Sequence, residues 1–108
     1  MTTSDMREEW VRLSKAWIRE AREGSNPTRT GLLDAPMIDA CGDVTGLTVL
    51  DCGCGEGRFC RILAQRGATS VLGLDLCEPM ILAARELQVG GDIYQVADVQ
   101  QMDVLMTP

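Results

Sequence analysis

The first third of this chain carries apolar residues at steps of three and four, with charged residues between them. This spacing predicts an amphipathic helix over residues 5–23, with Ser4 or Asp5 as its N-cap and a capping-box spacing between Asp5 and Glu8. A second, shorter helix is predicted over residues 32–41. The apolar stripe of the first helix consists of Trp10, Leu13, Trp17 and Ala21.

From residue 47 onward, short apolar runs alternate with helical patterns. Each run leads into an aspartate, at Asp51, Asp75 and Asp98. Strands that alternate with helices indicate a parallel sheet, so we predict an α/β fold with about three parallel strands and flanking helices. The predicted strands span 47–52, 70–75 and 93–97, and the predicted helices span 57–67 and 79–87.

A glycine-rich turn joins the first strand to the helix after it, with glycines at alternate positions of residues 53–57. Strand, glycine turn and helix form the architecture of a nucleotide-type cofactor site. The dinucleotide fingerprint G-x-G-x-x-G does not fit, because the third glycine comes one position early and Arg58 stands where glycine is required. Asp51 and Glu56 would repel a pyrophosphate but not a ligand that carries an ammonium and a sulfonium.

The run from Val49 to Phe59, VLDCGCGEGRF, closely resembles motif I of the class I S-adenosylmethionine-dependent methyltransferases, in their small-molecule branch. Asp75 lies 22 residues after Gly53, near the ~20-residue offset of a ribose-binding acid. The segment that ends in Asp98 resembles the family segment that meets adenine. The resemblance implies a Rossmann-like sheet, half of a seven-stranded methyltransferase fold preceded by N-terminal helices.

The resemblance also implies S-adenosylmethionine as cofactor, S-adenosylhomocysteine as product and a small-molecule acceptor. Asp51 would face the positive end of the cofactor and Asp75 would hold the ribose hydroxyls. Asp98 and the Val99 N–H would read the adenine edge, and Arg29 would meet the methionine carboxylate. The expected cofactor-binding residues are Arg29, Asp51, Gly53, Cys54, Gly55, Gly57, Asp75, Leu76, Met80, Asp98 and Val99.

Several of these positions have two interpretations. Met80 suits contact with adenine beside Leu76 or a place in the core at the first turn of a helix. Asp98 suits adenine recognition or a strand-end cap, and Arg29 suits a carboxylate contact or a solvated turn. The tryptophan stripe of residues 5–23 suits core packing or a lid over the cofactor.

Two segments are expected, a helical segment over residues 1–46 that serves as a possible cofactor lid and the N-terminal half of a methyltransferase domain over residues 47–108. The family draws its acceptor groups from later strands, so no catalytic residue is assigned. Three hypotheses stay open: the cofactor-binding part of a methyltransferase, a non-catalytic S-adenosylmethionine-binding or interaction module, and a short nicotinamide-binding domain. The glycine spacing and the acidic loop disfavour the third.

The composition of the chain argues against nucleic acid, membrane and metal as partners. The 108 residues carry a net charge of −6, which disfavours an extended nucleic-acid surface. No apolar run approaches the ~20 residues of a membrane span, and residues 1–9 lack the apolar core of a signal peptide, so we predict a cytoplasmic protein. Five cysteines without histidine do not complete a zinc site, and no metal is expected.

The first predicted strand raises the question of oligomeric state. In the resembling fold it lies between the second strand and a fourth strand. Without a fourth strand, the apolar run from Leu47 to Leu50 leaves one edge unpaired. We therefore predict a homodimer, or a partner chain that covers this edge.

Overall fold

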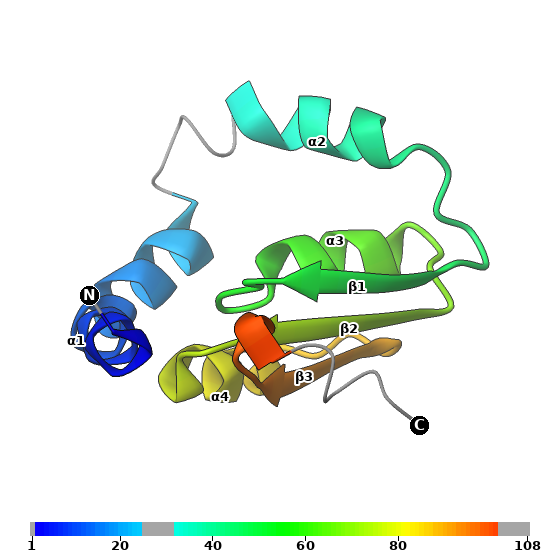
Figure 1. Cartoon of the computed structure of the whole chain (residues 1–108). Helices are drawn as coiled ribbons and strands as arrows, with labels where there is room; N and C mark the ends of the chain where they lie inside the picture. Colours follow the sequence, from blue (N-terminus) through cyan, green and yellow to red (C-terminus); the bar gives the residue numbers. More distant parts are fainter. Residues whose placement is uncertain (1, 25–31, 102–108) are drawn as a thin grey trace.

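The computed structural model describes residues 2–24 and 32–101. Its elements confirm the predicted α/β fold, with helices first and then alternating strands and helices (Figure 1). A short 3₁₀ helix at Val99–Gln101 follows the last strand. The helices and strands are α1 (Thr3–Glu23), α2 (Asp34–Cys41), β1 (Thr48–Cys52), α3 (Arg58–Gln65), β2 (Ser70–Asp75), α4 (Glu78–Glu86) and β3 (Asp92–Val96).

The sheet has three parallel strands in the order β1-β2-β3, as the alternation of strands and helices predicts. Asp51 pairs with Gly73, and Gly73 pairs with Tyr94. Because side chains alternate along a strand, these three positions share one face of the sheet. β1 lies at the edge of the described sheet.

Helices α3 and α4 pack on that same face and enclose the core. Cys60 of α3 and Ile81 of α4 are fully buried, and they meet Val71 of β2 and Tyr94 of β3 in one cluster. Burial of a valine or isoleucine side chain contributes about 1.5–3 kcal/mol, so this cluster is the main source of cohesion between sheet and helices. The opposite face leaves Leu50 41% exposed and Ile93 59% exposed.

Helix α1 begins two residues earlier than predicted, and its cap is a different residue. The Thr2 hydroxyl accepts the Asp5 N–H at 3.1 Å, and the Asp5 carboxylate accepts the Thr2 N–H at 3.0 Å. The prediction of Ser4 or Asp5 as N-cap is therefore wrong, because Asp5 occupies the third position of the first turn. The reciprocal pair is a capping box with Thr2 as its cap.

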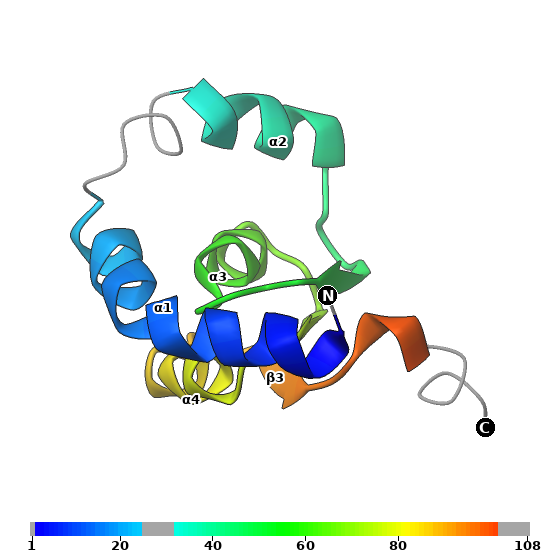
Figure 2. The ribbon, with the colours of Figure 1, turned by 60° about the vertical axis from the view of Figure 1, so that its left-hand side comes forward.

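Two arginines fasten the N-terminal helices to the rest of the molecule. Arg22 of α1 donates to the Ala83 carbonyl at 3.1 Å and to Glu86 at 3.0 Å, so α1 lies against α4 (Figure 2). Arg58, at the start of α3, donates two hydrogen bonds to Asp34 at the start of α2. None of the helices in the described part of the chain is long and apolar enough to cross a membrane.

Candidate functional site

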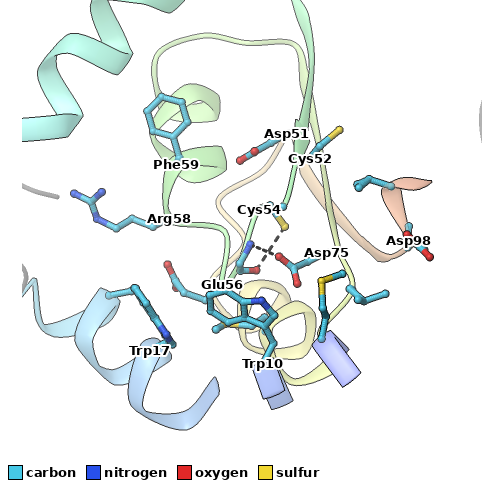
Figure 3. Close-up of a pocket in the computed structure, with 18 of the residues that line it drawn as sticks. Trp10, Trp17, Asp51, Cys52, Cys54, Glu56, Arg58, Phe59, Asp75 and Asp98 are labelled. Carbon is cyan, nitrogen blue, oxygen red and sulfur yellow. Dashed lines mark hydrogen bonds between the residues drawn. The ribbon is translucent and has the colours of Figure 1, made fainter. Parts of the chain in front are cut away.

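A cavity of about 610 Å³ opens at the carboxyl ends of β1 and β2 (Figure 3). This is where parallel α/β sheets bind ligands, and the volume falls in the ordinary range for small-molecule sites. α1 and α2 form the opposite wall through Met6, Trp10, Trp17, Leu33 and Met37. Of the predicted residues, those that line the cavity are Asp51, Gly53, Cys54, Gly55, Asp75, Leu76, Met80, Asp98 and Val99.

The glycine loop turns tightly at the end of β1. The N–H groups of Gly53 and Cys54 donate to the Leu74 carbonyl at 2.8 and 2.9 Å. Gly53 has φ of 79° and Gly55 has φ of 59°, in the left-handed region that favours glycine. A Cβ on either residue would meet no other atom within 4 Å. The main chain of the loop therefore faces open space that a ligand can fill.

Gly57 has a different neighbour from the other two loop glycines. A Cβ on Gly57 would lie 2.7 Å from the ring of Tyr94, which is 2% exposed. Gly57 does not line the cavity. The structure thus places the third glycine over the core, and its contact with a cofactor remains a prediction. Arg29, the remaining predicted residue, lies outside the described residues.

The carboxylate of Asp75 links the glycine loop to the start of α4. Its Oδ2 accepts the Gly55 N–H at 2.9 Å, and its Oδ1 accepts the Cys77 N–H at 2.9 Å. A carboxylate has about four lone-pair sites, so both oxygens keep capacity for further donors. Asp75 is therefore held in a fixed orientation and can still bind hydroxyl groups in the cavity.

Asp51 stands deeper in the site, at the end of β1. The Cys60 thiol donates to its Oδ2 at 3.3 Å. Burial raises the pKa of Asp51, against the lowering effect of the Cys60 hydrogen bond, and the charge of Asp75 raises it further. A cationic ligand group beside Asp51 would oppose this shift and favour the charged carboxylate.

The Cys60 thiol is inert as an acid. Contact with Cys54, followed by burial and the negative charge of Asp51, raises the pKa of Cys60 far above its usual range. Cys60 is also fully buried, so it is a small core side chain that donates weakly to Asp51.

The sequence identifies Glu56 only as an acidic residue of the glycine loop. In the structure it is 5% exposed and lines the cavity, and Arg61 donates to its Oε2 at 2.7 Å and to its backbone carbonyl at 2.6 Å. An i,i+5 spacing is not one of the usual helix-pair signals, so the sequence did not reveal this ion pair.

Of the apolar stripe of α1, the residues Trp10, Trp17 and Ala21 line the cavity. Trp10 is 45% exposed, and its ring centroid lies 5.9 Å from that of Trp17. Figure 3 places Trp10 in front of the glycine loop and Trp17 on the side of Glu56 and Arg58. The two indoles thus form an aromatic wall opposite the loop.

A family model described as a methyltransferase domain matches residues 49–108. The chain belongs to the class I S-adenosylmethionine-dependent methyltransferases. The match begins inside β1 and includes the glycine loop, Asp75 and Asp98. The resemblance stated from motif I is therefore confirmed at the level of the family.

Individual relatives agree with this assignment. The chain is 32% identical over 89 residues to a ubiquinone biosynthesis O-methyltransferase of Neisseria meningitidis, covering 82% of this chain and 36% of the relative. A solved S-adenosylmethionine-dependent methyltransferase from Mesorhizobium loti is 43% identical, with a TM-score of 0.57, over 61% of this chain and 31% of that one. The chain spans about a third of the length of the curated relatives that it matches.

The fold extends to more distant structures. Magnesium protoporphyrin IX methyltransferase from Synechocystis, solved with bound S-adenosylhomocysteine, matches 93% of this chain and 53% of its own with a TM-score of 0.67. Its 24% sequence identity supports likeness of fold alone. The match supports the order of elements, an N-terminal helical part followed by three parallel strands with flanking helices.

Proposed function

We propose that this chain forms the cofactor-binding part of a methyltransferase that transfers a methyl group from S-adenosylmethionine to a small-molecule acceptor, with S-adenosylhomocysteine as product. The observation that carries the proposal is the anchored carboxylate of Asp75. It stands at the end of β2, is fixed by the Gly55 and Cys77 N–H groups, and belongs to a residue that lines a cavity of suitable size. Two adjacent ribose hydroxyls suit such a carboxylate.

The other cavity residues fit the remaining parts of the cofactor. Leu76 and Met80 offer apolar surface for adenine, and Asp98 with the Val99 N–H offers polar groups for its edge. The uncovered main chain at Gly53 and Gly55 leaves room for the ribose and methionine portions. Arg29 is proposed for the methionine carboxylate on the strength of the resemblance alone.

The protein's part in the reaction is to bind, orient and exclude water. S-adenosylmethionine supplies an electrophilic methyl group on a positively charged sulfur. Asp51 contributes a negative charge near the positive end of the cofactor, and Trp10 and Trp17 close the cavity from the side of α1. Helices α1 and α2 are proposed as a lid, held by Arg22 on α4 and by Arg58 on Asp34.

A non-catalytic S-adenosylmethionine-binding module is the second candidate. The chain spans about a third of the length of the curated relatives that it matches, so turnover by the chain is a proposal of its own. This candidate is favoured by the described cavity residues, which we assign to cofactor contacts and none of which we assign as a base or to an acceptor pocket. Cofactor binding by these 108 residues and methyl transfer by them therefore require separate experiments.

Calorimetric titration with S-adenosylhomocysteine, S-adenosylmethionine and NAD tests the proposal. The acidic loop should favour the two sulfur-containing ligands over NAD, because Asp51 and Glu56 oppose a pyrophosphate. Tighter binding of NAD would overturn the proposal. A methyl-transfer assay with a panel of small hydroxylated and amino compounds then separates a methyltransferase from a binding module.

A further inference from the structure

Glu56 carries a buried carboxylate with one oxygen satisfied and the other unpaired. Oε2 accepts from Arg61 at 2.7 Å. Among the residues that the structure describes, Oε1 of Glu56 is the buried side-chain nitrogen or oxygen atom without a hydrogen-bond partner. An unpaired buried acceptor destabilises a fold, so such an atom in a native protein calls for an explanation, for example a functional role, a bound water or a bound ion.

The unpaired oxygen belongs to a residue that lines the cavity. In Figure 3, Asp98 and Glu56 lie on opposite sides of Asp75. If adenine lies at Asp98 and the ribose at Asp75, as the proposed function has it, the side of Glu56 receives the amino-acid end of the cofactor. That end carries an α-ammonium group, which has three N–H donors at neutral pH.

The surroundings of Glu56 suit a donor better than an anion. Asp34, Asp51 and Asp75 also line the cavity, and Arg58, the cation among the described lining residues, is engaged by Asp34. The last torsion of a glutamate side chain is broad, so a small rotation of the whole carboxylate can bring Oε1 toward a donor in the cavity, and the long side chain of Arg61 can follow Oε2. A donor from the ligand would complete the hydrogen bonds of the carboxylate.

We propose that Oε1 of Glu56 accepts a hydrogen bond from the α-ammonium group of the cofactor's methionine portion. This inference rests on the proposed function and adds a residue for which the sequence resemblance implies no role. It assigns the buried ion pair of Glu56 and Arg61 to ligand recognition, with Arg61 as the residue that orients the carboxylate.

The substitution Glu56→Gln tests the contact with little change in volume. Arg61 is a donor, so it will hold the amide oxygen, and the amide N–H₂ will stand where Oε1 was. The ligand ammonium then faces a donor instead of an acceptor. We expect the affinity for S-adenosylhomocysteine to fall about tenfold or more, as for the loss of one charge-assisted hydrogen bond. 5′-Methylthioadenosine, which lacks the amino-acid end, should bind equally to both proteins.

Two further measurements keep the inference falsifiable. Glu8→Gln, at an exposed position of α1, removes the same charge away from the cavity and should leave both affinities unchanged. On the unmodified chain, an S-adenosylhomocysteine analogue with hydrogen in place of the amino group should bind about tenfold more weakly than the parent compound. This second measurement does not depend on the folding of any variant.

The outcomes separate this inference from the proposed function. If the unmodified chain binds neither S-adenosylhomocysteine nor 5′-methylthioadenosine, the proposed function fails and the inference fails with it. If it binds both, but Glu56→Gln weakens both equally or neither, Glu56 has a structural role or none and only the inference is overturned. Equal binding of the deaminated analogue and the parent compound leads to the same conclusion.

Discussion

The ring of Tyr94 lies directly beneath Gly57, and a Cβ on that glycine would come within 2.7 Å of the ring. The Tyr94 hydroxyl donates to Asp92 Oδ2 at 2.6 Å, and both side chains are fully buried. Asp92 also accepts the N–H groups of Val89 and Gly90 at 2.9 Å. The end of the glycine loop therefore packs against Tyr94 of β3, and the hydrogen bond to Asp92 holds the Tyr94 ring in place.

This relationship predicts different costs for two glycine substitutions. Gly53→Ala introduces only backbone strain, about 1–2 kcal/mol, because its Cβ would face open space. Gly57→Ala adds overpacking against Tyr94, typically about 1–3 kcal/mol more. Urea unfolding of both variants measures the difference. A double variant, Gly57→Ala with Tyr94→Leu, should recover part of the additional cost, and strict additivity would contradict the proposed contact.

Asp75 should matter for ligand affinity and also for the shape of the loop. Asp75→Ala removes a charge-assisted acceptor from the ribose, so the affinity for S-adenosylhomocysteine should fall at least about tenfold. It also frees the Gly55 and Cys77 N–H groups, so a modest loss of thermal stability should accompany the loss of affinity. Calorimetry and thermal unfolding measure the two effects.

Asp75→Asn is the matched control for this prediction. It keeps the size of the side chain and one acceptor oxygen, and it exchanges the other acceptor for a donor. Its affinity should lie between those of Asp75→Ala and the unmodified chain, with circular dichroism in the far ultraviolet unchanged. Affinity equal to that of the unmodified chain in both variants would remove Asp75 from the site.

The raised pKa of Asp51 predicts a conflict between stability and binding. Burial makes the folded chain prefer the neutral carboxyl, so this preference stabilises the fold at low pH and the contribution is lost as the pH rises through the raised pKa. Asp51→Asn is neutral at every pH. It should therefore raise the melting temperature at pH 7, and the gain should shrink as the pH is lowered toward the ordinary aspartate range.

The same variant should bind S-adenosylmethionine more weakly, because the negative charge near the positive end of the ligand is gone. S-adenosylhomocysteine, which lacks the sulfonium charge, should lose less affinity. A melting temperature below that of the unmodified chain at pH 7 would contradict the burial argument. Equal losses for the two ligands would show that Asp51 does not act on the sulfonium charge.

The sequence predicted the sheet because each strand is a short apolar run between turn signals, and the glycine loop because its spacing is local. It did not predict the residues that hold the site together. Asp34 and Arg58 are 24 positions apart, and the contact of Tyr94 with Gly57 spans 37. Such pairs form only when strands and helices pack, so the spacing of apolar residues along the sequence does not predict them. The cap of α1 was misplaced for a local reason, since Thr2 and Asp5 offered a better reciprocal pair than Asp5 and Glu8.

The lid hypothesis predicts a fluorescence signal from α1. The chain has two tryptophans, Trp10 and Trp17, and both line the cavity. Binding of S-adenosylhomocysteine should exclude water from the indoles and shift their emission to shorter wavelength. In Trp10→Phe the remaining shift reports Trp17 alone, and in Trp17→Phe it reports Trp10. Calorimetric binding without any change in emission would show that α1 does not cover the ligand.

The edge of β1 predicts self-association. Within the described residues β1 pairs with β2 alone, so its other side presents unpaired N–H and C=O groups, and no lysine or proline occurs in its sequence. Parallel strands are normally covered on both faces, yet Leu50 is 41% exposed beside the open edge. Light scattering over a dilution series should therefore detect a dimer at the higher concentrations.

A pair of lysine substitutions locates the contact. Leu50→Lys places a charge on the open face of β1 and should shift the dilution curve toward monomer, because two copies would bring like charges together. Leu82→Lys alters a similarly exposed leucine, 49% exposed on α4, and should leave the curve unchanged. A cooperatively folding monomer at every concentration would contradict association through β1. Equal shifts in both variants would place the contact elsewhere, because Leu50 belongs to β1 and Leu82 does not.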